Sequence, residues 1–261
     1  MSVVPFLAPV ESRFDLQGAQ PWLASYGYTS IAVSVVYLIL TFVGRRWMSS
    51  RPAFNLRRPL VMWNAGLAVF SILGFLTVSP FLAKTLVENG FSSSVCSDGL
   101  HGRSAPRQLW NLLLLLSKNV ELGDTAFIVL RKTPLNFLHW YHHITVYTYG
   151  AWFSRTSGEV AITFWMGATN YFVHSLMYTY YTVKAAGVRV PRWVAQLITI
   201  IQLAQFVVGV VTILTAFLQK SSGVDCDASY DLLYAGLAIY VSYFILFLNF
   251  FYQRYLKKKV E

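Results

Sequence analysis

Residues 137–146, FLHWYHHITV, place three histidines inside an otherwise apolar and aromatic stretch of the chain. His139, His142 and His143 are three and four residues apart, so on a helix they share one face. An imidazole can bind a metal, relay a proton or carry an acyl group as a nucleophile. Because ionisable groups are costly in lipid, such a cluster indicates a functional site.

Three other apolar segments each carry one polar stripe. They are residues 117–125 (SKNVELGDT), 170–181 (NYFVHSLMYTYY) and 199–205 (TIIQLAQ). At 100° per residue, the polar members of each segment fall on one helical face. The four stripes are therefore expected to face a common interior, which they would line with His139, His142, His143, Lys118, Glu121, Asp124, Asn170, His174, Tyr178 and Gln202.

The composition predicts the element type that positions these stripes. Hydrophobic residues make up 56% of the 261 positions and charged residues 12%, about half of the ~25% that is usual in soluble proteins. The chain has no internal repeat or long linker, which predicts one domain over residues 1–261. We expect an all-α, polytopic membrane protein with about seven transmembrane helices. The candidate spans are residues 29–44, 59–82, 107–130, 135–153, 160–183, 193–218 and 232–253.

Lysine and arginine are distributed unevenly between the two sides of these spans. The loops after the first, third and fifth spans and the C-terminal segment hold fourteen basic residues and one acid, against six basic residues and eight acids opposite. This asymmetry predicts a cytosolic C-terminus and a luminal N-terminus. It also accounts for the net charge of +10 without a nucleic-acid partner, for which the sequence has no motif.

The chain ends in KKKVE, so Lys258 and Lys259 stand fourth and third from the carboxyl end. This spacing matches a dilysine signal for retrieval to the endoplasmic reticulum. The same lysines would also contact anionic lipid beside the last span. We therefore expect a multi-pass protein of the endoplasmic-reticulum membrane.

The polar stripes lie in the cytosolic half of the predicted bundle, and apolar residues dominate the luminal half. This distribution predicts a polar chamber that opens to the cytosol and continues into a blind apolar tunnel. Trp165 and Phe217 are candidates for the end wall of that tunnel, where bulky side chains would limit the length of a bound chain.

Two alternatives to acyl transfer remain open at this point. Histidines with carboxylates can hold a metal, as in a membrane lipid hydroxylase or desaturase-like enzyme. Di-iron enzymes of that kind use more histidines than the five found here, so a single ion is the form that remains. A proton-coupled transporter has less support, because the chain shows no repeat and no matched pair of broken helices.

Four segments, KNVELGDT, FLHWYHHITV, NYFVHSLMYTYY and TIIQLAQ, resemble in order and spacing the signature motifs of the ELO family of fatty acid elongases. The resemblance runs from Arg57 to the C-terminus. It implies an acyltransferase, a very-long-chain 3-oxoacyl-CoA synthase, that joins a long-chain acyl-CoA to malonyl-CoA with loss of CO2. The HWYHH, ELGDT and AAGVRV segments most resemble the subgroup acting on saturated and monounsaturated long-chain acyl-CoAs.

The resemblance also implies surroundings for the reaction. Spans two to seven would enclose a narrow acyl tunnel open to the cytosol, and no cofactor or metal would be needed. Membrane lipid and the reductases and dehydratase of microsomal elongation would be its partners. A homodimer is compatible with the sequence.

The resemblance assigns the acyl group to the middle histidine of the box, His142, with His174 as its partner. His139, His143, Lys118, Glu121 and Asp124 complete the candidate catalytic set. A cysteine nucleophile is not expected, because Cys96 and Cys226 fall in predicted luminal loops. Asn170, Tyr178 and Gln202 are candidate donors to the substrate, and the basic groups expected to contact CoA are Arg131, Lys132, Lys184, Arg189 and Arg254.

The two cysteines carry a prediction of their own. The charge distribution places both in the lumen, an oxidising compartment, so we expect a disulfide between Cys96 and Cys226.

Overall fold

The computed structural model describes residues 8–14, 16–96, 105–157 and 160–257. Within these ranges the chain is helical apart from short connections and contains no strand, which confirms the all-α prediction. Lys258 and Lys259 lie outside the described residues. The elements are α1 (Ala8–Arg13), α2 (Leu16–Ser49), α3 (Arg57–Cys96), α4 (Ala105–Glu121), α5 (Gly123–Leu130), α6 (Phe137–Ser157), α7 (Ala161–Ala185), α8 (Arg192–Ser221), α9 (Tyr230–Phe251) and the π-helical turn η1 (Tyr252–Leu256).

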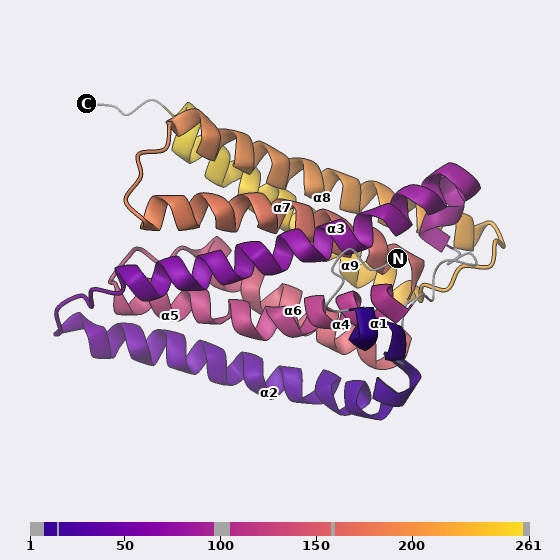
Figure 1. The fold of residues 1–261 in the computed structure, drawn as a ribbon, viewed down its shortest axis with the longest axis horizontal. Coiled ribbons are helices and arrows are strands. Elements are labelled where there is room, and N and C mark those ends of the chain that lie inside the picture. Colours follow the sequence, from indigo (N-terminus) through magenta and orange to yellow (C-terminus); the bar gives the residue numbers. More distant parts are fainter. Residues whose placement is uncertain (1–7, 15, 97–104, 158–159, 258–261) are drawn as a thin grey trace.

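Helices long and apolar enough to cross a membrane confirm a polytopic membrane protein. Within the described residues there are four of them, Gly18–Ser49, Arg57–Cys96, Arg192–Ser221 and Tyr230–Leu256. The α4–α5 pair, α6 and α7 run along the same axis in the bundle (Figure 1). These three carry three of the four polar stripes, including every charged or histidine member, which lowers their mean hydropathy relative to the four helices above.

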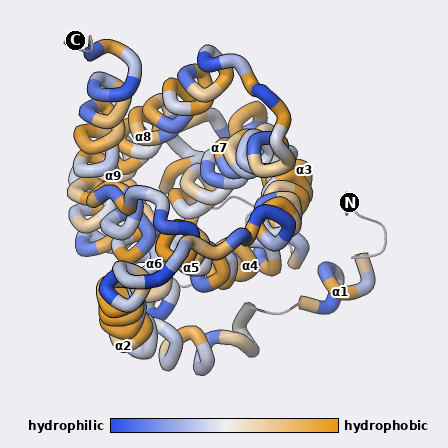
Figure 2. Tube along the Cα trace, turned by 90° about the vertical axis from the view of Figure 1, so that its left-hand side faces the viewer, coloured by the Kyte–Doolittle hydropathy of each residue, from blue (hydrophilic) through white to orange (hydrophobic). Residues whose placement is uncertain are grey.

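Five of the described helices form a ring in which each contacts the next, in the order α4, α6, α9, α8 and α7, and α7 contacts α4. The helix α2 lies outside this ring, against α5 and α6 (Figure 2). The helix α3 packs mainly against α7, and it approaches so closely that a side chain at Gly74 would collide with the ring of Tyr171.

The third predicted span, residues 107–130, is two helices. α4 ends at Glu121 and α5 begins at Gly123. A Cβ atom at Gly123 would lie 2.7 Å from the ring of Trp63, so only glycine allows α3 to approach here. Glu121 and Asp124, expected on one helix, therefore belong to two helices that meet at Leu122, whose φ and ψ of −56° and −27° are themselves helical.

The two ends of the bundle differ chemically. At the basic end lie the α2–α3, α5–α6 and α7–α8 connections and the C-terminal turn (Figure 1), with Arg51, Arg131, Lys132, Arg189, Arg254 and Lys257. At the opposite end, here called the disulfide end, Cys96 is bonded to Cys226 with their Cα atoms 4.4 Å apart. Cys96 is the last residue of the 40-residue helix α3 rather than part of a loop, because α3 continues past Pro80 and past a kink at Gly90.

The disulfide predicts the number of free thiols and the stability of the protein. The two cysteines are 130 positions apart, and in a chain-entropy model closing such a loop stabilises the fold by ~4–5 kcal/mol. We expect no free thiol in unfolded, non-reduced protein, two after reduction, and a lower unfolding temperature for the Cys96→Ser/Cys226→Ser variant. Labelling of two thiols before reduction would contradict the pairing.

Candidate functional site

Two cavities lie inside the helix ring. The first, the polar chamber, has a volume of about 350 Å³ and is lined by all three histidines of α6, by His174 and by both carboxylates, Glu121 and Asp124. The second, the apolar tunnel, has a volume of about 190 Å³ and is lined by residues of α4, α6, α7, α8 and α9 and by Leu23 of α2. Four residues line both cavities and mark their junction: His142, Asn170, Gln205 and Phe206.

The start of α6 presents its histidines to the chamber. Asn136 accepts a hydrogen bond from the backbone N–H of His139 (2.8 Å), the type of contact that begins a helix. The rings of His139 and His143 lie 4.3 Å apart between centroids. On its other edge, His139 Nε2 contacts Thr125 Oγ1 at 2.9 Å, and this hydroxyl contacts the Tyr37 hydroxyl of α2 at 2.7 Å.

His142 points to the junction of the two cavities. Its ring packs 4.7 Å from that of Tyr243 and 6.3 Å from that of Phe247, both on α9. The Tyr243 hydroxyl contacts Thr145 Oγ1 at 2.7 Å, which links α9 to α6 one turn beyond the histidine. Tyr243 belongs to none of the polar stripes in the sequence, because α9 is rich in aromatics and no polar pattern sets this one apart.

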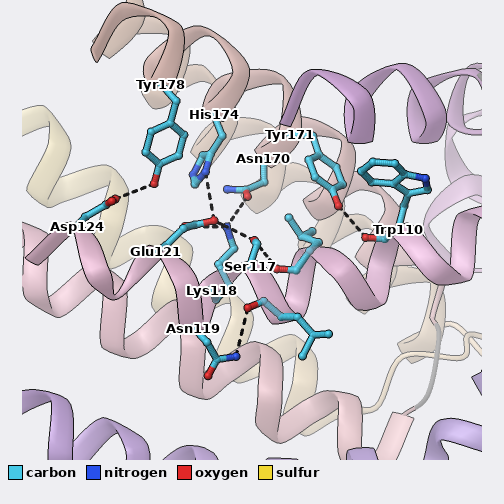
Figure 3. A network of polar contacts seen from close by, with 12 residues as sticks. Trp110, Ser117, Lys118, Asn119, Glu121, Asp124, Asn170, Tyr171, His174 and Tyr178 are labelled. Carbon is cyan, nitrogen blue, oxygen red and sulfur yellow. Dashed lines mark hydrogen bonds and ion pairs between the residues drawn. The ribbon is translucent and has the colours of Figure 1, made fainter. Parts of the chain in front are cut away.

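A buried ionic network joins α4 to α7 (Figure 3). Lys118 Nζ donates to both oxygens of Glu121, at 2.8 and 3.1 Å, and to Asn170 Oδ1 at 2.8 Å. Ser117 Oγ donates to Glu121 Oε1 at 3.0 Å. His174 Nδ1 lies 3.6 Å from the same oxygen. Lys118, Glu121 and His174 are all buried. The network therefore places a pair of opposite charges next to His174, the chamber histidine on α7.

Asp124 lies outside this network and is held by two other donors. Trp63 Nε1 donates to one oxygen at 2.6 Å and the Tyr178 hydroxyl donates to the other at 2.7 Å (Figure 3 shows the second). Trp63 lies on α3, which contributes no residue to the lining of either cavity. Span two was expected to help enclose the tunnel, and α3 does so from behind the lining residues. It contacts the site through Trp63 and through Leu67 and Ala68, which form one apolar cluster with Tyr178.

The remaining candidate residues divide into two groups. Asn170, Tyr178 and Gln202 line the chamber, as do Lys184 and Arg254 at its basic end. Arg131, Lys132 and Arg189 line neither cavity. Lys132 instead donates to the carbonyl oxygens of Ser49 and Arg51, at 3.2 and 3.0 Å.

The predicted end wall of the tunnel is also wrong. Trp165 and Phe217 do not line it. Trp165 donates to Ser94 Oγ at 3.1 Å, and Phe217 packs against Tyr230 and Tyr234. On α7 the tunnel-facing residues are Thr163, Met166, Gly167 and Asn170, so Trp165 is turned away from it. At the disulfide end the tunnel is lined by Phe153, Val160 and Leu232.

Metal ligation can be assessed from the arrangement of the side chains. Among the residues that the structure describes, no three His, Cys, Asp or Glu side chains are grouped so that they could hold one ion. The two carboxylates nearest the histidines already accept hydrogen bonds from lysine, serine, tryptophan and tyrosine side chains.

Comparison with known proteins gives consistent matches over nearly the whole chain. The family model described as "ELO: GNS1/SUR4 family" matches residues 22–261. The chain is 40% identical over 251 residues to the very long chain fatty acid elongase 3 of Homo sapiens, an alignment that covers 95% of this chain and 91% of the relative. It is 40% identical over 261 residues to the very long chain fatty acid elongase 6 of Drosophila melanogaster, covering 98% and 82%.

The Lys118–Glu121 pair generates a prediction about stability. Removing one partner of a buried pair leaves an uncompensated charge, which costs about 3–5 kcal/mol, whereas replacing both partners by apolar groups is often neutral. We therefore expect Lys118→Met to lower the unfolding temperature in detergent strongly, and Lys118→Met/Glu121→Leu to recover much of the loss.

The matched control is a second lysine–glutamate pair. Lys84 and Glu88 are 3.8 Å apart with side chains 51% and 44% exposed, so Lys84→Met should cost less than about 0.5 kcal/mol. Equal unfolding temperatures for Lys118→Met and Lys84→Met would contradict the ionic network.

Proposed function

This chain belongs to the ELO (GNS1/SUR4) family, and we propose that it catalyses the condensing step of fatty acid elongation. It joins a long-chain acyl-CoA to malonyl-CoA and forms a 3-oxoacyl-CoA two carbons longer, with release of CO2 and CoA. The observation that carries this proposal is the position of His142, where a polar chamber meets an apolar tunnel.

The two cavities match the two halves of an acyl-CoA. The apolar tunnel suits a hydrocarbon chain, since burial of each CH2 contributes ~0.8 kcal/mol. The thioester carbon then lies at the junction beside His142, and CoA extends through the chamber. Lys184 and Arg254 line the chamber and are suited to its phosphates by charge.

The first half-reaction transfers the acyl group to His142. A ring nitrogen attacks the thioester carbon, the C–S bond breaks, and the proton lost from the imidazole goes to the departing CoA thiolate. The products are an acyl-imidazole and free CoA. The acyl chain stays in the tunnel while malonyl-CoA takes the place of CoA in the chamber.

The second half-reaction forms the carbon–carbon bond. The bond from malonyl-CoA to its carboxylate breaks, CO2 leaves, and the electron pair remains on the enolate carbon. That carbon attacks the acyl carbonyl, and the C–N bond to His142 breaks. The imidazole regains a proton, for which we assign His174 as the donor, with Glu121 3.6 Å from its Nδ1, and a proton from solvent replaces the one that His174 gives up. Asn170, Tyr178 and Gln202 are assigned to stabilise the enolate and carbonyl oxygens.

His139 and His143 are assigned a supporting role at this centre. They sit beside His142 on α6, and their rings contact each other. The contact from His139 to Thr125 supports the view that they orient the box.

We assign the protein to the endoplasmic-reticulum membrane, with the basic end of the bundle and the C-terminus in the cytosol. The substrates are then delivered from the side on which the chamber carries Lys184 and Arg254. The 3-oxo product requires reduction, dehydration and a second reduction, so reductases and a dehydratase are its partners. Saturated and monounsaturated long-chain acyl-CoAs are the assigned substrates.

The acyl intermediate can be tested by intact mass after incubation with acyl-CoA alone. We expect one acyl adduct on the wild-type protein and none on His142→Ala. His139→Ala is the matched control, because it removes an imidazole from the same helix face and should retain part of the adduct. Full acylation of His142→Ala would show that another residue is the nucleophile.

The condensation itself should need no metal. Purified protein given malonyl-CoA and a C16 acyl-CoA is expected to release CO2 and form a 3-oxoacyl-CoA at the same rate with and without a chelator. Activity lost on chelation and restored by a metal would favour a metal-dependent lipid enzyme instead.

A further inference from the structure

The connection between α8 and α9 gathers three helix ends at the disulfide end of the bundle. Cys226 is bonded to Cys96, the last residue of α3. Asp227 Oδ2 accepts a hydrogen bond from the backbone N–H of Ala161, the first residue of α7, at 2.9 Å. Ser229 Oγ accepts from the backbone N–H of Leu232, in the first turn of α9, at 3.2 Å. Residues 224–229 are called the clamp segment below.

The same helix ends supply the blind end of the apolar tunnel. Val160 directly precedes α7, Leu232 is in the first turn of α9, and both line the tunnel. Each is 2% exposed, and both belong to one apolar cluster with Cys96 and Cys226. The carbonyl of Leu232 accepts from the Tyr149 hydroxyl at 3.2 Å, which connects this end wall to α6. The residues of this wall are therefore packed against the disulfide that anchors the clamp segment.

Asp227 supplies what α7 lacks. The residue before the helix is Val160, whose side chain makes no capping hydrogen bond. A carboxylate at a helix N-terminus satisfies a free backbone N–H and interacts favourably with the helix dipole. The backbone of Asp227 is itself held, because its N–H donates to the carbonyl of Cys96 at 3.2 Å. A continuous series of contacts therefore runs from the disulfide through the Asp227 cap to the end wall.

We propose that Asp227, anchored by the Cys96–Cys226 disulfide, is a positioning residue for acyl chain length: it holds the start of α7 so that Val160 and Leu232 close the tunnel. This inference rests on the proposed condensing function. On α6, the wall residue Phe153 is eleven positions beyond His142, which corresponds to ~16 Å along the helix axis. A retreat of the wall by ~2.5 Å admits one more two-carbon unit, since an extended chain advances ~1.2 Å per bond.

The test measures condensation rates over a series of saturated acyl-CoAs that differ by two carbons. The chain-length ratio is the rate with the next longer acyl-CoA divided by the rate with the preferred one. For Asp227→Ala we expect this ratio to rise about fivefold, because the loss of one helix cap changes an equilibrium by about that factor. Asp227→Asn keeps an acceptor oxygen and should restore most of the wild-type ratio. Asp225→Ala, an exposed aspartate in the same segment, is the matched control and should leave the ratio unchanged.

Two further variants keep the test decisive if Asp227→Ala does not fold. Cys226→Ser should shift the ratio in the same direction, because it releases the anchor. Leu232→Ala should shift it by opening the wall directly. An unchanged ratio in all folded variants, with condensation intact, would overturn the inference. Absence of condensation by wild-type protein with every acyl-CoA would instead contradict the proposed function.

Discussion

The structure depends on one constraint, the need to keep ionisable groups away from lipid. Lys118, Glu121 and His174 are buried within helices of a membrane bundle, where an unpaired charge is strongly unfavourable. Pairing Lys118 with Glu121 and Asn170 satisfies that requirement only if α4 and α7 face each other. The network therefore fixes the rotation of both helices and, with it, the side of α7 that presents His174 to the chamber.

The arrangement of the other helices follows from this inward rotation. With polar faces turned inside, α6, α8 and α9 complete the ring, and their apolar residues close the tunnel. The helices α2 and α3 pack against this ring, and their polar contacts nearest the site are Tyr37 to Thr125 and Trp63 to Asp124. The chamber stays polar and the tunnel apolar because they lie at different depths of one bundle, and His142 lies where they meet.

Much of this site could be predicted from the sequence because membrane helices leave their polar residues few positions to occupy. The stripes identified the four histidines of the chamber, Lys118, Glu121 and Asn170. They missed Trp63, because a tryptophan near a helix end is typical of membrane interfaces. The prediction that Trp165 closes the tunnel was wrong, because successive residues on a helix point 100° apart. The neighbouring helices determine which of them faces the tunnel. The close approach of Trp63 to Gly123 is a tertiary contact, so the polar pattern of a single helix does not reveal it.

The central claim is that one acyl chain is held at His142 while its far end reaches the disulfide end of the tunnel. An acyl-CoA with a photoreactive group at its terminal carbon tests both ends at once. After incubation, irradiation and peptide mapping, we expect one acyl chain to join the peptide containing His142 to residues around Phe153, Val160 or Leu232. Cross-links to α3, which lines neither cavity, or an acyl group on a residue other than His142, would contradict this account.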